Sequence, residues 1–477
     1  MSQDAEQNGG PRLKPALMVA LSLVMTLYMI CAIPVLVLAG MLLVHACTAQ
    51  GRLFALAVIF GLPAPVLLWV ATHIRRKRGV LTAGAACGLL AILLLGTDYL
   101  LTPDGLALPG SPARSCFTGA TAYRRTSMAN LVPEMDQLVL GTYVVPAMDR
   151  LMDKRNTEEL RSQVRAVYGE MRSSPEFERL GSVMDQTYRD LFFDERPAGH
   201  FYEYVPATTQ GRLPVVIFLH GSLGNFRGYL WVWKRVADEY GVAVVAPTFG
   251  AGRWKEPGGT EAVEGALRYC ASHPRMDPSR IYLAGLSNGG LGVCLAAGRS
   301  PDAYRGVILI SPVLDLMALF AHQSGASWKN KPVLILHGAA DNRVPLAYVG
   351  EAAEEMRSAG MRVESQIYDG QSHFLFFTIR DKVQDRIGSW IGNGEKEPKV
   401  SHTVITTAEE GVTYLAAHPP SGASFQLAIS DSFTFAGQPD AIGAGMAVIV
   451  DKMLGFGYTP DGFEQKKGFK LYRYKKT

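Results

Sequence analysis

Residues 281–290 read "IYLAGLSNGG", an apolar run that enters a glycine-rich turn, and the small-residue segment "LGVCLAAG" follows. This pattern is typical of a strand, a tight turn and a helix, with a serine at the sharpest point of the bend. Gly285 and Gly289 flank Ser287, at positions where a side chain would collide with the strand or the helix. Glycine-flanked serines are also common in ordinary turns. Ser287 is therefore a candidate nucleophile only if the chain supplies its partners.

Two later apolar runs end in such partners. "KPVLILHGAADNRVP" (331–345) carries Asp341 after a predicted strand, and "RVESQIYDGQSHFLFF" (362–377) carries His373 after the next one. A serine hydroxyl needs a base to take its proton, and that base must be oriented by a carboxylate. We therefore predict Ser287 as nucleophile, His373 as general base and Asp341 as the acid. Asp315, which follows an earlier apolar run, is the alternative acid.

The chain also offers donors for a developing oxyanion. In "LPVVIFLHGSLGN" (213–225) an apolar strand runs into a His-Gly-Ser turn upstream of the serine. The backbone N–H groups of Ser222 and Asn288 are the predicted oxyanion donors, because the latter follows the nucleophile directly. His220 is interpreted as a structural histidine that braces this turn rather than as a base.

Four motifs, "HGSLGN", "GLSNGG", "HGAADNRVP" and "DGQSH", occur in this order and resemble those of the α/β-hydrolase superfamily. They are most similar to its esterase, dienelactone hydrolase and polyhydroxybutyrate depolymerase-like branch, and to the catalytic domain of prolyl oligopeptidase-type peptidases. The resemblance covers roughly residues 200–392. It implies an α/β fold with a mostly parallel sheet, the roles assigned above to Ser287, Asp341 and His373, and no metal or organic cofactor.

The N-terminal part predicts a membrane region. About thirty residues from Pro15 carry no charge, and two further apolar stretches follow, so we predict spans at about 15–45, 53–74 and 80–101. A helix needs roughly 20 apolar residues to cross a bilayer. A cleaved signal peptide would explain only the first stretch.

Basic residues predict the orientation. The link between the second and third spans reads "RRKR" (75–78), whereas Arg52 is the only basic residue between the first and second. By the positive-inside rule this link and the tail 1–14 are cytoplasmic, and the part after residue 101 lies outside the plasma or inner membrane.

Composition divides the remainder into three segments. We predict a linker and a helical spacer or cap at 102–195, the α/β-hydrolase domain at 196–392, and a linker with a small α+β unit at 393–477. The basic stretch 466–476 is interpreted as a solvated strand face rather than a lipid-binding tail. Trp231, Trp233 and Trp254 are either core or the wall of a substrate pocket.

The overall charge excludes one class of partner. Lys and Arg number 47 against 43 Asp and Glu, too even a balance for a nucleic-acid reader. Six scattered cysteines predict neither a disulfide framework nor a metal site. The expected partners are a small-molecule or lipid-like acyl ester and membrane lipids, and the oligomeric state stays open.

The sequence thus predicts a membrane-anchored serine hydrolase of carboxylic esters or thioesters. Three alternatives stay open: a prolyl oligopeptidase-type peptidase, an acyltransferase to an envelope acceptor, and a non-catalytic membrane scaffold. The peptidase ranks second because no propeller repeat is visible upstream of the hydrolase motifs.

Overall fold

The computed structural model describes residues 15–74, 77–119, 121–147, 152–207, 211–321, 328–393, 404–417, 419–420, 424–436, 442–466 and 469–477. The predicted tail 1–14, Arg75, Arg76 and most of the predicted linker at 393–399 lie outside these residues. The chain divides into two compact units, Met1–Gly392 and Asn393–Thr477, which are described separately below.

The first unit begins with four apolar helices, which are α1 (Pro15–His45), α2 (Ala49–Gly61), α3 (Pro63–Ala71) and α4 (Lys77–Leu101). They contain three stretches long and apolar enough to cross a membrane, Val19–His45, Ala49–Ala71 and Arg78–Leu101. The second begins four residues before its predicted start at Leu53, because the Thr48 side chain accepts the Gly51 N–H and caps α2. Many apolar side chains of these helices face outward, as a lipid environment requires.

The centre of the unit is an eight-stranded sheet in the order β1-β2-β4-β3-β5-β6-β7-β8. β1 pairs antiparallel with β2, and β2 with β4, while the remaining neighbours are parallel. The strands are β1 (Ala113–Phe117), β2 (His200–Tyr204), β3 (Leu213–Leu219), β4 (Ala243–Pro247), β5 (Met276–Leu286), β6 (Gly306–Ile310), β7 (Pro332–Gly338) and β8 (Arg362–Tyr368). This order and direction confirm the predicted α/β class and its mostly parallel sheet.

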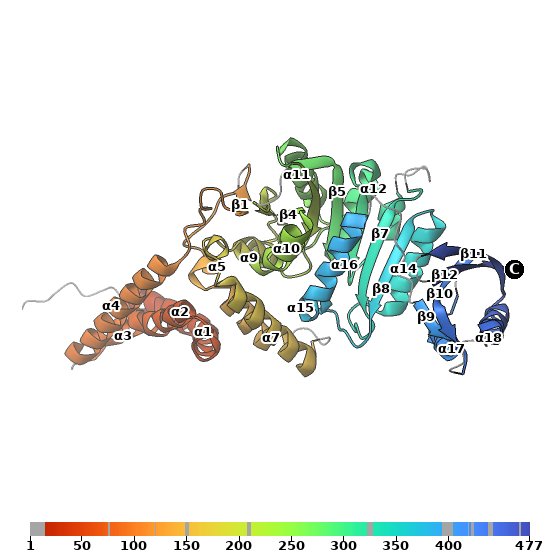
Figure 1. The fold of residues 1–477 in the computed structure, drawn as a ribbon. Helices are drawn as coiled ribbons and strands as arrows, with labels where there is room; N and C mark the ends of the chain where they lie inside the picture. The colour runs from red at the N-terminus through yellow and green to blue at the C-terminus, as the bar shows by residue number, and fades with distance from the viewer. Residues whose placement is uncertain are drawn as a thin grey trace, which may run out of the picture. The chain divides into compact units, whose positions relative to one another are not determined.

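Helices cover both faces of the sheet (Figure 1). Along β3, Val216 and Phe218 face one core, whereas Val215, Ile217 and Leu219 face the other. Both faces are apolar because both are covered, as expected of parallel strands. The first core includes α10 (Arg227–Tyr240) and α16 (Arg380–Asn393); the second includes α11 (Gly259–Ser272), α12 (Gly289–Arg299) and α14 (Leu346–Ser358).

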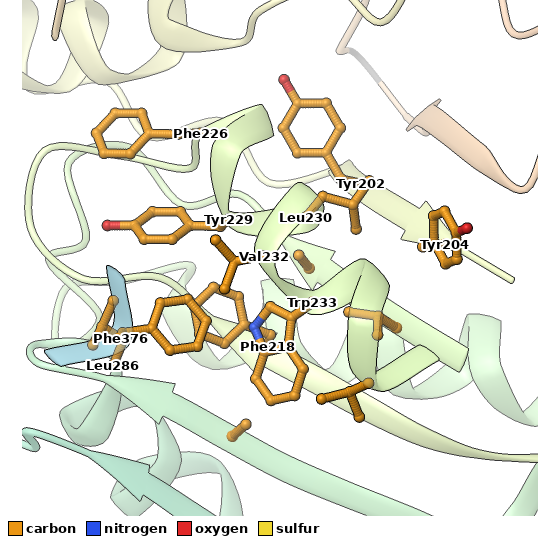
Figure 2. Packing of buried hydrophobic residues seen from close by; sticks show 14 of the residues in the cluster. Tyr202, Tyr204, Phe218, Phe226, Tyr229, Leu230, Val232, Trp233, Leu286 and Phe376 are labelled. Carbon is orange, nitrogen blue, oxygen red and sulfur yellow. The ribbon is translucent and has the colours of Figure 1, made fainter. Parts of the chain in front are cut away.

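An aromatic cluster lies in the first core (Figure 2). The ring centroid of Phe218 on β3 is 5.4 Å from that of Trp233, 5.5 Å from Tyr229 and 5.8 Å from Phe376. Burying each such ring stabilises the fold by about 1.5–3 kcal/mol. Phe376 belongs to α15 (Leu375–Thr378), which begins two residues after His373. The cluster therefore anchors the segment that carries this histidine.

The segment predicted as a linker and helical spacer, 102–195, contributes to the same sheet and core. β1 extends the sheet edge, and the helices α5 (Met128–Leu131), α6 (Glu134–Val144), α7 (Lys154–Met171), α8 (Pro175–Glu178) and α9 (Met184–Phe193) follow it. On α7, Val164, Val167, Tyr168 and Met171 form one apolar stripe, which is buried in the first core. Within the segment predicted as a linker and helical spacer or cap, residues 113–117 form a strand that the sequence reasoning did not expect.

The second unit is a four-stranded sheet in the order β11-β12-β10-β9, with two helices. β9 and β10 are parallel, and the other pairs are antiparallel. Its elements are β9 (Val404–Thr407), α17 (Ala408–Ala417), β10 (Ser424–Thr434), α18 (Ile442–Gly455), β11 (Tyr458–Lys466) and β12 (Phe469–Lys476). It has a core of its own, which includes Phe433, Ile449 and Tyr474, and it is the α+β appendage expected from the sequence.

Candidate active site

Ser287 stands on the sharp turn between β5 and α12, with a φ of 52°. A positive φ is uncommon for a residue with a Cβ and costs on the order of 1–3 kcal/mol unless its surroundings hold it. Its N–H donates to the Ile310 carbonyl at 2.9 Å, and its carbonyl accepts from Gly290 at 2.9 Å and from Val313 at 3.0 Å. The backbone around Ser287 is therefore fixed by the end of β6 and by the start of α12.

Close backbone packing explains the glycines of this turn. A Cβ at Gly289 would lie 2.1 Å from the Leu219 carbonyl oxygen, and one at Gly285 would lie 2.6 Å from Gly289. These are the two glycines expected from the motif. Gly290 is a third position of this turn where a side chain does not fit, because its Cβ would lie 2.4 Å from the Val313 carbonyl oxygen. The motif spans only Gly285 to Gly289, so it did not predict a requirement for glycine at 290.

His373 bridges Ser287 and Asp341. Its Nε2 lies 2.9 Å from Ser287 Oγ, and its Nδ1 lies 2.8 Å from Asp341 Oδ2. The histidine and the carboxylate are buried, whereas the serine is half-buried. Three side chains from the ends of β5, β7 and β8 thus form one hydrogen-bonded chain that begins at a partly accessible hydroxyl.

Asp341 is held as a carboxylate by groups on both of its oxygens. Although burial acts in the opposite direction, the hydrogen bond to His373 and the N–H groups of Val344 and Arg343 keep the pKa of Asp341 below its usual value. Those two N–H groups donate to Oδ1, each at 2.9 Å. The other oxygen, Oδ2, is therefore oriented toward the imidazole.

Asp315, the alternative acid, has a different partner. Its Oδ2 lies 2.7 Å from Lys255 Nζ, and its Oδ1 accepts the N–H of Ala318 at the start of helix α13 (Leu316–Phe320). The hydrogen bond to Lys255 lowers the pKa of Asp315. The imidazole of His373 is bound by Asp341 instead.

The predicted oxyanion turn lies beside Ser287. A Cβ at Gly221 would lie 3.3 Å from the Ser287 Cβ, so the two backbones approach closely. Leu223 has a φ of 74°, and its N–H donates to the Ala251 carbonyl at 3.1 Å. Across the described residues, neither the Ser222 N–H nor the Asn288 N–H is matched with a protein acceptor. Both donors are thus available to a bound group.

His220 braces this turn in its neutral form. Its Nε2 accepts the Phe249 N–H at 3.1 Å, so Nδ1 carries the proton and donates to the Gly221 carbonyl at 2.8 Å. Burial lowers the pKa of His220 to about 4. The Trp254 indole N–H donates to the His220 carbonyl at 2.9 Å, which adds a second support.

Two of the three tryptophans pack as core, and the third lies half-buried beside it. Trp233 and Trp254 are fully buried, and Trp231 is half-buried against Phe177, with ring centroids 5.0 Å apart. Their large side chains fill the two faces of the sheet, so the core interpretation holds for Trp233 and Trp254.

Two polar residues of α7 approach the loops that carry Asp341 and His373. Asn156 Nδ2 lies 3.5 Å from Asn342 Oδ1, and Glu159 Oε2 lies 3.4 Å from Ser372 Oγ. Sequence reasoning missed both, because they lie about two hundred positions before the loops that they touch and no motif marks them.

Metal-ligating side chains do not gather at this site. Within the described ranges, no three His, Cys, Asp or Glu side chains are grouped so that they could hold a metal ion. The six cysteines are free thiols, and Cys270 and Cys294 are buried.

Comparisons with known proteins agree with this fold. Residues 260–391 match the Phospholipase/Carboxylesterase family. A poly(3-hydroxybutyrate) depolymerase of Ralstonia pickettii is 30% identical over 135 residues, 23% of this chain and 28% of that protein. A protein of Oryza sativa subsp. japonica described as a probable inactive carboxylesterase is 29% identical over 108 residues, 23% of this chain and 44% of that protein. The chain thus spans less than half the length of both relatives.

A solved esterase of the archaeon Pyrobaculum calidifontis is 20% identical, with a TM-score of 0.35 over 48% of this chain and 94% of that one. The strand order, the serine turn and the family match at residues 260–391 together identify the fold of the first unit's sheet domain as that of the α/β-hydrolases.

Proposed function

We propose that this protein is a membrane-anchored serine hydrolase that cleaves carboxylic esters or thioesters through an acyl-enzyme. The observation that carries the proposal is the hydrogen-bonded chain from Ser287 through His373 to Asp341, set on a turn that holds the serine at a positive φ. The similarity to the Phospholipase/Carboxylesterase family over residues 260–391 favours esters over other acyl substrates.

In the proposed first half-reaction, His373 Nε2 takes the proton of Ser287 Oγ as that oxygen attacks the carbonyl carbon. Asp341 holds the Nδ1–H tautomer and stabilises the imidazolium that forms. The carbonyl π electrons move onto oxygen, where the N–H groups of Ser222 and Asn288 stabilise the charge. Collapse then breaks the bond to the alcohol or thiol, which leaves with the proton from His373.

In the second half-reaction, water takes the place of the leaving group. His373 removes a proton from the water, the hydroxide attacks the acyl carbon, and the second tetrahedral intermediate expels Ser287 Oγ, which recovers a proton from His373. The products are the free acid and the regenerated serine. Arg343 and Val344 hold Asp341 in place through both half-reactions.

The N-terminal helices suggest where the substrate is found. Three candidate spans precede the hydrolase domain. The basic residues at the link between the second and third spans support a cytoplasmic position of that link under the positive-inside rule. The catalytic domain then lies on the outer face. We propose that the anchor presents the site to lipid-like or cell-envelope acyl esters.

A fluorophosphonate probe, which reacts with activated serines, tests the catalytic proposal. The full-length protein in detergent should be labelled, and Ser287→Ala should abolish the label, whereas Ser272→Ala, at the exposed end of α11, should retain it. Persistent labelling of Ser287→Ala would falsify the assignment of the nucleophile. Para-nitrophenyl esters of increasing acyl length, compared with dipeptide anilides, then separate an esterase from a peptidase.

A pair of introduced cysteines tests the orientation. Met317 is exposed on α13, and His73 is exposed between α3 and α4. An impermeant maleimide applied to intact cells should label Met317→Cys, and should label His73→Cys only after lysis. The reverse pattern contradicts the proposed orientation.

A further inference from the structure

A cavity of about 690 Å³ lies where the apolar N-terminal helices meet α5, α6 and α7, within the first unit. Its wall includes the link between α1 and α2 with the start of α2 (residues 47–50), the end of α4 with the residues after it (100–104), and parts of α5, α6 and α7. The volume is within the range of small-molecule sites, roughly 300–1,000 Å³. The serine chain described above does not line this cavity.

The cavity lies at the depth of the lipid headgroups if the three candidate spans cross a bilayer. The spans end or begin at His45, Ala49 and Leu101 on this side, and the cavity wall includes residues within a few positions of each. Leu100 is 76% exposed and Leu101 is 54% exposed, so an apolar surface leads up to the cavity. Polar groups line its interior, among them Gln50 and Asn130.

The charge of the cavity favours an anion. Four arginines line it, Arg125, Arg172, Arg179 and Arg227, against three carboxylates, Asp104, Glu134 and Glu178, which gives a formal balance of +1. Arg179 is paired with Asp104 at 2.6 Å, and Arg227 Nε lies 3.8 Å from Glu134.

The other two arginines lack a carboxylate partner among the described residues. Arg125 donates to the carbonyls of Tyr99 and Thr102 at the end of α4, where a cation is favoured by the helix dipole. Arg172 is exposed at the end of α7. Among the described residues its guanidinium makes a weak contact with Met135 Sδ at 3.8 Å and acts on the Asp136 carboxylate at longer range, without an ion pair.

Arg227 carries a buried N–H group that has no hydrogen-bond partner among the described residues. This group is Nε, and the side chain is 9% exposed. A buried, unpaired N–H of a charged group costs free energy. Its Nη1 donates to the Leu180 carbonyl, and its Nε faces Glu134 at 3.8 Å without a hydrogen bond. Because Arg227 lines the cavity, a ligand oxygen there would give this one atom a hydrogen bond.

We propose that this cavity binds the phosphate-bearing headgroup of an anionic phospholipid whose acyl chains lie along Leu100 and Leu101. Guanidinium groups bind phosphate oxygens through paired N–H donors. Arg172 supplies such a pair, and Nε of Arg227 supplies a further donor. The proposal rests on the proposed membrane insertion, and it is independent of the role of Ser287.

Lipid binding by the full-length protein in dodecyl maltoside tests the site. Phosphatidylglycerol is titrated while the thermal unfolding midpoint is recorded, with phosphatidylcholine and inorganic phosphate as parallel titrants. Phosphatidylglycerol should raise the midpoint at the lowest concentration of the three, and Arg172→Ala should weaken its apparent affinity about tenfold. Arg165→Ala is the matched control, because Arg165 is exposed on the same helix and does not line the cavity.

Folding of each variant is checked by its midpoint without lipid, and Arg172→Gln, which keeps the bulk of the side chain, should reproduce the tenfold loss. Equal affinity of wild type and both Arg172 variants overturns the proposal, and so does equal affinity for the two lipids. If inorganic phosphate raises the unfolding midpoint at the same concentrations as phosphatidylglycerol, the cavity binds a free anion, and this result overturns the lipid assignment. Fluorophosphonate labelling of the same samples reports separately on Ser287.

Discussion

His337 Nδ1 lies 3.9 Å from Asp341 Oδ2, the same carboxylate oxygen that lies 2.8 Å from His373 Nδ1. His337 is fully buried, and burial lowers its pKa, so it faces the acid as a neutral ring. Its Nε2 lies 3.1 Å from the Val344 carbonyl oxygen and donates to it. Because Val344 also donates its N–H to Asp341, His337 supports the loop that orients the acid.

This relationship predicts different effects for two substitutions at position 337. His337→Gln can keep a donor near the Val344 carbonyl, so kcat should stay within about threefold of wild type. His337→Leu leaves that buried carbonyl unpaired and frees the loop, so kcat should fall by about tenfold or more with KM little changed. Ester hydrolysis kinetics measure both, and equal losses for the two variants would show that the hydrogen bond to Val344 has no part in positioning Asp341.

A second prediction separates the two candidate acids. Asp341→Asn removes the carboxylate that selects the His373 tautomer, so kcat should fall by about 10³–10⁴. Asp315→Asn removes the charge that pairs with the exposed Lys255 but keeps an oxygen that can accept the Ala318 N–H, so kcat should change by less than about threefold. The same ester assay decides the matter, and a large loss in Asp315→Asn with little loss in Asp341→Asn would reverse the assignment.

A third prediction uses two glycines in contrasting surroundings. Gly289→Ala places a methyl 2.1 Å from the Leu219 carbonyl oxygen, a rigid backbone atom, so the variant should lose both stability and fluorophosphonate labelling. Gly350, on the exposed face of α14, has no atom within 4 Å of an added Cβ. Gly350→Ala should stabilise the protein by up to about 1 kcal/mol, because alanine favours the helix. Thermal unfolding compares them, and a stable, labelled Gly289→Ala protein would contradict the packing argument.

The elbow, the histidine and the acid loop could be predicted because their signals are local. Each follows an apolar run that forms a strand, and parallel strands bring their carboxyl ends to one edge. The position after a strand does not by itself distinguish Asp341 from Asp315, since both follow strands, and the sequence favoured Asp341 only through its loop. The partner of Asp315 is Lys255, sixty positions earlier, and only the tertiary structure brings the two together.

The segment 102–195 was less predictable, because its contacts too are made with distant parts of the chain. The apolar stripe of α7 indicates that one face is buried, but the stripe does not specify the surface that covers it. The short strand β1 lies next to a segment rich in proline and glycine, and its pairing with β2 spans more than eighty positions. The cavity beside the candidate membrane spans combines several separate parts of the chain, so no single stretch of sequence signals it.

The last prediction concerns pH and rests on His220. Burial lowers its pKa from 6.5 to about 4, so between these values the unfolded chain binds a proton that the folded protein does not. Stability therefore rises with pH across this window, is fully present above pH 6.5, and is lost as pH falls toward 4. The slope from one such group is about 1.4 kcal/mol per pH unit, or about 3 kcal/mol in total.

His220→Gln removes the titrating group while leaving an amide that can accept the Phe249 N–H. The variant should be less stable than wild type at pH 7, because the bond from Nδ1 to the Gly221 carbonyl is lost. As the pH is lowered from 6.5 to 5, the unfolding midpoint of the variant should fall less steeply than that of wild type. Part of the fall that remains is expected from His200, because burial lowers its pKa to about 3. Thermal unfolding followed by tryptophan fluorescence across this range measures the difference. If both proteins lose stability in parallel as the pH falls, His220 is not the neutral buried brace described here, and the turn that presents the Ser222 N–H must be held by other groups.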